Sequence, residues 1–324
     1  GFFYFWRMHW VFDNKISFEK RALRLFEEQS QKCLPYNQYL KLLKTDVESI
    51  SSLAEIPFLP IQFFKTHSII AKGKKPAIRF SSSGTTGMER SQHVVADLSI
   101  YEYSFRTAFE LFYGDIEKYR FIALLPSYLE REGSSLIYMC EDLIKRSKHP
   151  QSGFYLNNLD ELSEIIKEDK PTILLGVTYA LLDLAELGPF QLNNTIIMET
   201  GGMKGKRKEM LKDELHQTLS NAYGVDLIHS EYGMTELLSQ AYSKGNGRFS
   251  TPHWMRVFSR DIEDPFSLTN NGKTGGLNII DLANIHSCAF IATQDLGRVY
   301  TDQTFEVLGR FEQSDIRGCN LLVQ

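Results

Sequence analysis

A repeated alternation of short apolar runs and longer amphipathic stretches, between residues 77 and 242, is the feature that most constrains the fold. Short apolar runs are typical of buried strands, and apolar residues three or four apart are typical of helices. The predicted strands are Ala77–Ser81, Arg120–Leu125, Thr172–Gly176, Thr195–Met198 and Asp226–Ile228. The predicted helices are Ser99–Tyr113, Ser135–Arg146, Leu159–Glu168, Tyr179–Glu186, Lys206–Ser220 and Glu236–Tyr242. This order predicts an α/β fold with a mainly parallel sheet and helices on both faces.

The segments on either side of this alternation have a different character. Residues 17–50 look helical, because their apolar side chains fall near one stripe with charges elsewhere. After about Gly245 the runs GGLNIIDLAN and GRVYTDQTFEVLGR indicate strands joined by tight turns, and therefore an antiparallel β region. The expected segments are 1–65, helical and aromatic and packed on the domain, 66–245, the α/β core, and 246–324, a β-rich subdomain.

Composition narrows the class of protein. The 324 residues are 43% hydrophobic and 23% charged, which is enough apolar material for a sizeable globular core. A formal net charge of -4 gives no basic field that would attract nucleic acid. No run of about 18 apolar residues occurs, so no membrane span is predicted. The 4 cysteines are far apart and form no CxxC pair, which argues against a zinc site and favours free thiols in a cytoplasmic protein.

The stretch IRFSSSGTTGMERSQH, residues 78–93, places a loop rich in hydroxyl groups and glycine directly after a predicted strand. It is not a Walker loop, because Gly84 and Gly87 are not followed by Lys and then Ser or Thr, and it lacks the GxGxxG fingerprint. Its backbone N–H groups could converge on an anion, and its glycines permit close approach. The hydroxyls that could add donors belong to Ser81, Ser82, Ser83, Thr85 and Thr86. A plain serine and glycine linker would look similar, and this stretch alone does not separate the two.

A second stretch, HSEYGMTE at residues 229–236, comes just after a predicted strand. Two further stretches follow in order: ATQDLGRV at residues 292–299 and GRFEQSDIRGCNLL at residues 309–322. Together with SSGTTG, these motifs resemble those of the adenylate-forming enzymes, over roughly residue 80 to the C-terminus. The resemblance implies the large N-terminal domain of that superfamily, with an antiparallel β region after the parallel sheet. It also implies ATP-dependent activation of a carboxylic acid to acyl-AMP, with release of pyrophosphate.

The resemblance implies phosphate and metal ligands at matching positions. The residues that would hold the β- and γ-phosphates of ATP are Ser82, Ser83, Gly84, Thr85, Thr86 and Gly87. Arg90 sits where the family often has a basic residue, and Thr235 would bond the α-phosphate. Glu236 would hold Mg²⁺, a cation that suits one carboxylate together with phosphate oxygens.

The nucleoside would have its own set of residues by the same resemblance. Tyr232 would stack on or flank adenine, with Gly233 beside it, and Gly201 and Gly202 lie in ETGGMKG, where the family places its adenine loop. Asp295 would accept hydrogen bonds from the ribose hydroxyls. Arg310 would contact the ribose or the region of the α-phosphate.

Each of these roles has a plainer alternative. Glu236 could cap or solvate the start of a helix, and Asp295, followed by a glycine two residues later, could belong to an ordinary turn. Arg310 could be a surface charge. His93 and His229 adjoin motifs, but a packed or solvated histidine is the more common outcome for each.

Typical members of the superfamily continue into a small C-terminal domain that carries a catalytic lysine, and we expect that domain to be absent here. The LuxE-type acyl-protein synthetases of bacterial fatty-acid reductase systems are short in this way. The chain resembles them in LPSYLEREGSSLIYM, residues 125–139, in TPHWMRVFSRD, residues 251–261, and in SDIRGCNLL near its end. That resemblance implies a fatty acid as substrate. It also implies transfer of the acyl group to a cysteine near the C-terminus, for which Cys319 is the matching position.

Some support for Cys319 comes from its neighbours. A thiol is a strong nucleophile once its pKa is lowered and it ionises, and Arg317 and Arg310, which are near it in sequence, could lower that pKa. Gly318 could let this loop move toward the adenylate, although a cysteine beside NLLV could also be a small buried residue. The other cysteines have apolar surroundings in the sequence, and we expect them to pack in the core: Cys33, Cys140 and Cys288.

Two other functions remain open at this point. The chain could be a ligase that passes the acyl group to coenzyme A, a carrier-protein thiol or an amine, or a non-catalytic remnant that binds a nucleotide or an acyl group. An acyl-enzyme would need a partner that removes the acyl group, such as a reductase or another acceptor protein. Candidates for lining an acyl pocket beside the sheet, which could equally be plain core, are Phe154, Tyr155, Val177 and Tyr179.

Overall fold

The computed structural model describes residues 9–82, 90–125, 133–202, 207–208, 210–269 and 271–311. The chain divides into two compact units. Unit 2 is the continuous stretch 76–252, and unit 1 joins residues 1–75 to residues 253–324. The expected division into segments 1–65, 66–245 and 246–324 stays a prediction.

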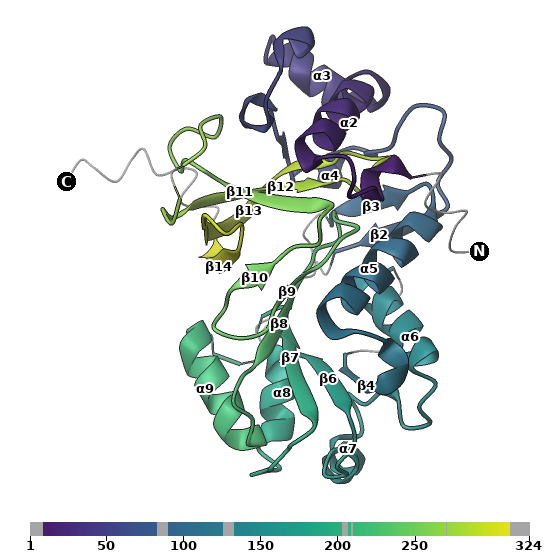
Figure 1. Ribbon diagram of the computed structural model, residues 1–324, viewed down its shortest axis with the longest axis vertical. Helices are drawn as coiled ribbons and strands as arrows, with labels where there is room; N and C mark the ends of the chain where they lie inside the picture. The colour runs from purple at the N-terminus through teal and green to yellow at the C-terminus, as the bar shows by residue number, and fades with distance from the viewer. Residues whose placement is uncertain are drawn as a thin grey trace, which may run out of the picture. The chain divides into compact units, whose positions relative to one another are not determined.

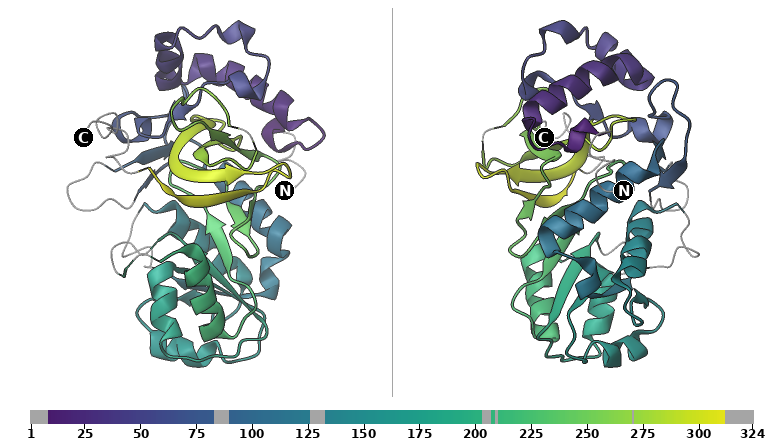
Figure 2. Two further views of the ribbon diagram at one scale, coloured as in Figure 1. Left: turned by 90° about the vertical axis from the view of Figure 1, so that its left-hand side faces the viewer. Right: turned by 45° about the vertical axis from the view of Figure 1, so that its right-hand side comes forward.

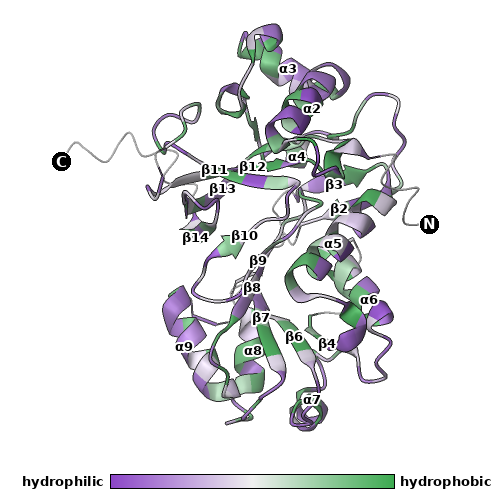
Figure 3. Cartoon of the chain, viewed as in Figure 1, coloured by the Kyte–Doolittle hydropathy of each residue, from purple (hydrophilic) through white to green (hydrophobic). Residues whose placement is uncertain are grey.

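The centre of unit 2 is a mainly parallel sheet (Figure 1). Its strands run in the order β10-β9-β8-β7-β6-β4-β5, and those from β8 to β5 are parallel to one another. The strands are β4 (Arg120–Leu124), β5 (Gly153–Phe154), β6 (Thr172–Val177), β7 (Thr195–Thr200), β8 (His229–Tyr232), β9 (Ala241–Ser243) and β10 (Phe249–Ser250). Every residue of β4 and β6 is buried, as expected of parallel strands that are covered on both faces. The apolar colour of β6 and α8 in Figure 3 marks this core.

Helices cover both faces of this sheet. The helices α8 and α9 lie together on one face, and α5 and α6 lie side by side on the other (Figures 1 and 2). The helices of unit 2 are α5 (Leu98–Tyr113), α6 (Ser135–Ser147), α7 (Leu159–Ile165), α8 (Thr178–Ala185) and α9 (Lys212–Tyr223), with a 3-10 turn at Ile116–Lys118. The start of α5 is capped by Asp97, whose side chain accepts a hydrogen bond from the Ser99 N–H. A separate antiparallel pair, β2 (Ile78–Ser81) and β3 (Gln92–Val95), precedes α5.

Unit 1 combines helices from the start of the chain with strands from its end. The helices are α2 (Phe18–Lys32), α3 (Leu34–Leu42) and α4 (Phe63–Thr66), with 3-10 turns at Trp10–Phe12, Val47–Ser49 and Leu53–Glu55. The strands are β1 (Leu59–Pro60), β11 (Met255–Arg260), β12 (Gly275–Asp281), β13 (Phe290–Val299) and β14 (Phe305–Arg310). The last four form an antiparallel meander, and β1 pairs in parallel with β13. Phe290 packs against Phe26 and Tyr36, with ring centroids 5.8 and 6.0 Å away.

The predicted fold class is confirmed, with a parallel core followed by antiparallel strands. Three predicted elements were wrong in place or type. Residues 226–228 are not a strand; β8 begins directly after them, at His229. A hydropathy pattern does not reveal β8, because most of its side chains are polar. Residues 236–242 are not a helix; they form a turn and then β9, and Leu237, Leu238 and Tyr242 are all buried, so they show no one-sided helical stripe. The helix predicted from residue 206 begins at Lys212.

No helix among the residues that the structure describes has the length and apolarity needed to cross a bilayer.

Candidate active site

Two neighbouring parallel strands of unit 2 end beside each other and carry candidate motifs. The strand β7 ends at Thr200 and is followed by Gly201 and Gly202, while β8 ends at Tyr232 and is followed by Gly233. Ligands of open α/β sheets bind at the carboxyl ends of such strands. Gly201 has a φ of 70°, and a Cβ added to Gly202 would meet no atom within 4 Å. The backbone after β7 is therefore open to close approach by a ligand.

The loop after β8 is a tight turn that is hydrogen-bonded to a buried histidine, His93. The Leu237 N–H donates to the Met234 carbonyl at 3.1 Å, which leaves Thr235 and Glu236 at the centre of the turn. The His93 Nδ1 lies 3.0 Å from the Thr235 carbonyl oxygen. Because a carbonyl only accepts, His93 carries a proton on Nδ1.

His93 stays neutral at physiological pH. Its side chain is fully buried, and this burial lowers its pKa to about 4, although the bond to Thr235 favours the charged form. His229, at the start of β8, has a pKa that burial and the nearby Lys244 also lower to about 4, and its Nδ1 lies 3.2 Å from the Tyr113 hydroxyl. Both histidines are packed, neutral side chains, which is the more common of the outcomes expected from the sequence.

A buried carboxyl group connects the ends of β7 and β8. Glu231 pairs with Thr200 in the strand register, and the Thr200 hydroxyl donates to the Glu231 Oε2 at 2.6 Å. Burial raises the pKa of Glu231 to about 7 in spite of this hydrogen bond, and nearby Glu199 adds to the rise. For Glu199 itself, contacts with His216 and Lys212 outweigh burial and hold the pKa below its usual value. The Lys212 Nζ lies 3.2 Å from the Glu199 Oε1.

Tyr232, the residue expected to flank adenine, is nearly buried at the end of β8. Its ring lies edge-on to Phe249, with centroids 5.9 Å apart. The Lys212 Nζ lies 4.6 Å from the centroid of the same Phe249 ring, a cation–π distance. Glu236 is also buried, in the turn and not at the start of a helix, so its alternative role as a helix cap does not hold.

Asp295 and Arg310 belong to unit 1 and face each other across neighbouring strands. Asp295 on β13 is directly opposite Arg310 on β14, and the Arg310 Nε donates to the Asp295 Oδ1 at 2.9 Å. The side chain of Asp295 is 5% exposed and that of Arg310 is 75% exposed. Asp295 therefore lies within a strand and not in an ordinary turn, and Arg310 is a surface charge with a buried partner. Arg260 on β11 donates to the Thr293 carbonyl at 2.5 Å, and burial lowers its pKa to about 10, although Asp295 favours the charged form.

Several expected site residues lie outside the described residues: Ser83, Gly84, Thr85, Thr86, Gly87 and Cys319. At the edges of the hydroxyl-rich stretch, Ser82 and Ser91 exchange hydrogen bonds of 3.0 Å, and Arg90 is exposed. Tyr155, one of the candidates for lining an acyl pocket, donates its hydroxyl to the Gln151 carbonyl at 2.9 Å. The contact between Thr200 and Glu231 was not predicted from the sequence, although both residues directly adjoin the glycine-containing motifs.

Solved structures define the class of protein by fold. ATP-bound MatB from Rhodopseudomonas palustris matches with a TM-score of 0.56 and 15% identity, over 72% of this chain and 48% of that one. A 2-hydroxyisobutyryl-CoA ligase in an open conformation, in complex with 2-HIB-AMP and CoA, matches with a TM-score of 0.67 and 11% identity, over 91% of this chain and 74% of that one. The fold is thus that of the large domain of adenylate-forming ligases, and the chain spans about half the length of MatB.

The family follows from the sequence itself. The family model described as acyl-protein synthetase, LuxE, matches residues 135–324. This is more than half of the chain, and the chain belongs to the LuxE acyl-protein synthetase family. A search of curated protein sequences found no match.

Proposed function

We propose that the chain activates a fatty acid with ATP and then takes the acyl group onto its own Cys319. In the first step, a carboxylate oxygen of the acid attacks the α-phosphorus of ATP, and the bond from that phosphorus to the bridging oxygen breaks. The products are acyl-AMP and pyrophosphate. In the second step, the Cys319 thiolate attacks the acyl carbon, the bond from this carbon to the AMP oxygen breaks, and AMP leaves. The proton of the thiol passes to solvent beforehand.

Membership in the LuxE acyl-protein synthetase family is the observation that carries this proposal. The fold supports it, because one structural neighbour was solved with ATP and another with 2-HIB-AMP and CoA. At 15% and 11% identity these ligands belong to those proteins, and we extend the adenylation chemistry to this chain as part of the proposal.

In unit 2 the proposed nucleotide ligands are the loops after β7 and β8. The hydroxyl of Thr235 would donate to the α-phosphate, where negative charge develops as the carboxylate attacks. The bond from His93 to the Thr235 carbonyl fixes the turn before the nucleotide arrives, so little reorganisation is needed at that point. Gly201 and Gly202 would let the backbone approach the adenine, and Tyr232 would flank it.

The donor chemistry of Glu236 fits a magnesium ion. Its carboxylate supplies the hard oxygen ligand that Mg²⁺ prefers, and Mg²⁺ commonly uses one or two carboxylates together with phosphate oxygens. When bound, the ion would neutralise charge on the phosphates and help pyrophosphate to leave. Glu236 would hold it, and the turn beside His93 would keep the carboxylate in place.

The ribose would be held by the carboxylate of Asp295, in unit 1. A carboxylate can accept from two hydroxyls at once, which matches the 2′ and 3′ groups of a ribose. The hydrogen bond from the Arg310 Nε orients this carboxylate.

The other cysteines support Cys319 as the acyl acceptor by their own surroundings. Cys33, Cys140 and Cys288 are buried and free, as expected from the sequence. Burial raises the pKa of Cys33 to about 11 and raises the pKa values of Cys140 and Cys288 well above the usual range. Since the thiolate is the nucleophile, these thiols are poor acyl acceptors at neutral pH.

Intact-protein mass spectrometry tests this function directly. The protein is incubated with ATP, Mg²⁺ and a panel of acids from acetate to palmitate, with benzoate added. A fatty acid is expected to give a mass increase equal to the acid minus water, and hydroxylamine should remove it as it cleaves thioesters. The increase should vanish in Cys319→Ala and persist in Cys288→Ala, the matched control at a buried cysteine.

Other outcomes would each overturn part of the proposal. A mass increase that survives Cys319→Ala would place the acyl group elsewhere. AMP formation without a mass increase would favour transfer to coenzyme A, a carrier-protein thiol or an amine. Failure of all the acids to yield AMP would contradict adenylation of this class of acids.

A further inference from the structure

Glu231 occupies the space between the two loops that carry the candidate nucleotide ligands. Its Oε2 accepts a 2.6 Å hydrogen bond from Thr200, the residue before Gly201. Its Oε1 lies on the other side, only 2.6 Å from where a Cβ on Gly233 would be. One carboxyl group therefore contacts the end of β7 and the start of the turn that contains Thr235.

The glycine at position 233 leaves room for the Glu231 carboxyl in its present place. A methyl group there would push the carboxyl away from its place, because 2.6 Å is far shorter than a normal carbon–oxygen contact. Gln240, where the turn segment leads into β9, lies on the same side, with its Cγ 3.6 Å from the same point. Glu231 is thus enclosed by the loop whose shape it supports.

We propose that Glu231 is a positioning residue that fixes the loop after β7 and the turn after β8 relative to each other for nucleotide binding. This inference rests on the proposed adenylation function. Glu231 acts through its neighbours, since Thr200 leads into Gly201 and Gly202 and Gly233 leads into Thr235. This positioning role of Glu231 differs from the roles as nucleotide ligands that are proposed for the motif residues themselves.

The protonated form of Glu231 suits this role best. An ionised carboxylate here would be buried and close to the charged Glu199, and its negative charge would repel an anionic nucleotide bound by these loops. The other titratable groups that face Glu231 are Glu199 on β7, Tyr101 and Tyr113 on α5, Cys140 on α6 and Tyr242 on β9. The tyrosines and the cysteine have raised pKa values and stay neutral. Near neutral pH, Glu231 is therefore the group of this set that changes charge.

The test compares KM for ATP in wild type, Glu231→Gln, Glu231→Leu and Thr200→Val, by ATP–pyrophosphate exchange from about pH 6 to about pH 8. The amide of Glu231→Gln can still accept from Thr200 and carries no charge. Wild-type KM for ATP should rise with pH through about 7, and Glu231→Gln should abolish that rise. Glu231→Leu and Thr200→Val should raise KM about tenfold at all pH values, because each removes the hydrogen bond between the loops.

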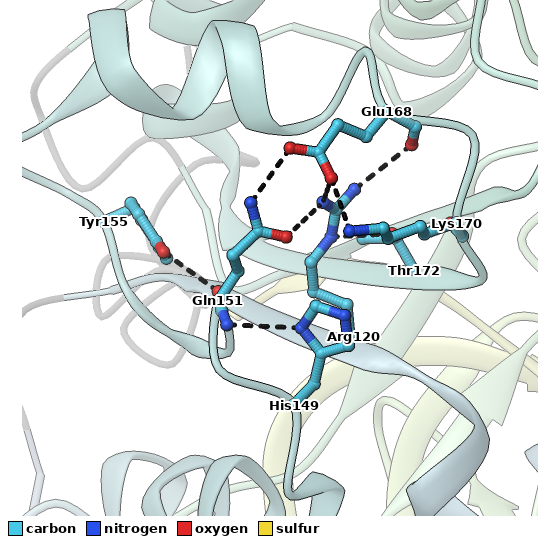
Figure 4. A network of polar contacts seen from close by, with 7 residues as sticks. All are labelled: Arg120, His149, Gln151, Tyr155, Glu168, Lys170 and Thr172. Carbon is cyan, nitrogen blue, oxygen red and sulfur yellow. Dashed lines mark hydrogen bonds and ion pairs between the residues drawn. The ribbon is translucent and has the colours of Figure 1, made fainter.

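Thr172→Val is the matched control for Thr200→Val. Thr172 is also a buried threonine bonded to an ionisable side chain, since its Oγ1 accepts from the Arg120 Nε at 3.1 Å (Figure 4). It begins β6, whereas Thr200 ends the neighbouring strand β7, so the two lie at opposite ends of the sheet. Thr172→Val should lower the melting temperature and leave KM for ATP unchanged.

The outcomes separate the two proposals. If wild type shows no exchange with any acid, adenylation itself is contradicted. If wild type exchanges but Thr200→Val and Glu231→Leu change only the melting temperature, as Thr172→Val does, Glu231 is merely structural and the inference fails. It also fails if Glu231→Gln keeps the wild-type rise of KM with pH.

Discussion

At the scale of single residues, the sequence motifs did not predict the side chains that contact the motif residues and hold their loops in place, His93 and Glu231. The motifs predicted that Thr235 and Glu236 both belong to the site, and the structure has both residues in one tight turn. The hydrogen bond from His93 to Thr235 spans 142 residues, and no local pattern can indicate a pairing that only the fold brings together. Glu231 was hidden for another reason, because a buried glutamate in a strand resembles an exposed one in a hydropathy profile.

His93 offers a first prediction at this scale. His93→Leu removes the donor to the Thr235 carbonyl and leaves that carbonyl unsatisfied, so adenylation measured as kcat/KM for ATP should fall about tenfold or more. His93→Asn, whose side-chain amide can donate from a similar position, should recover much of this loss. Equal losses in both variants, with unchanged melting temperatures, would contradict the role of the hydrogen bond.

Glu231 gives a pH dependence of stability. Its folded pKa, about 7, lies above the value near 4.5 of an exposed glutamate, so the folded protein binds this proton more tightly than the unfolded chain does. The free energy of unfolding should therefore fall as pH rises from about 4.5 to about 7, by up to about 3 kcal/mol from this group, and then level off. Urea unfolding of wild type and Glu231→Gln across this range checks it, because the difference between the two should follow that curve. A constant difference would contradict the raised pKa.

At the scale of elements, periodicity predicted those with a clear apolar pattern and failed where polar groups are buried. The strands β4, β6 and β7 and the helices α5, α6 and α8 lie within a few residues of their predicted ranges. The strands β8 and β9, beside the candidate site, were not predicted. The buried polar residues of β8 look like a loop in a hydropathy pattern, and the apolar pair Leu237 and Leu238 before β9 looks like part of a helix. Buried polar residues at the ends of these strands are thus what made them hard to predict from hydropathy.

Far from the candidate site, a polar network holds the starts of β4 and β6 together. Arg120 is completely buried and donates to Thr172 and to Gln151, both at 3.1 Å, and its Nη1 lies 3.6 Å from the Glu168 Oε2 (Figure 4). Lys170 also pairs with Glu168, at 2.6 Å. This network connects neighbouring strands at the end of the sheet opposite to the proposed nucleotide site.

Arg120→Met should therefore destabilise the protein without impairing turnover. It removes several buried hydrogen bonds and leaves Thr172 without its donor, so the free energy of unfolding should fall by about 3 kcal/mol. Arg146→Met, the same change at an exposed arginine on α6, should alter it by less than about 0.5 kcal/mol. Urea unfolding gives both values, and a lower kcat/KM in folded Arg120→Met would contradict a purely structural role.

At the scale of the whole molecule, the two units are built from the chain in different ways. Unit 2 is continuous, and unit 1 combines both ends of the sequence. The side chain of Gln29 on α2 shows why unit 1 needs both parts: its amide donates to the Asn284 carbonyl at 2.8 Å and accepts from the Ala289 N–H at 2.9 Å. The order of motifs in the sequence could not predict this pairing, because the contacts join segments about as far apart as the chain allows.

Fragments test this difference. Residues 76–252 alone should unfold cooperatively, because they contain a complete parallel core with helices on both faces. Residues 253–324 alone should not, because the partners of Phe290 come from α2 and α3. Circular dichroism during thermal melting checks both fragments, and a cooperative transition of the second would contradict the dependence. Mixing it with residues 1–75 should restore some structure.

The split origin of unit 1 sets an order of events during protein synthesis. The helices α2 and α3 leave the ribosome before unit 2, yet Phe26 and Tyr36 meet their partner Phe290 only after the whole of unit 2 has been made. Unit 2 can complete its core while Phe26 and Tyr36 still lack their contact with Phe290. The nascent chain therefore carries an uncovered apolar surface while unit 2 is being made, and such a surface is the kind of segment that chaperones bind.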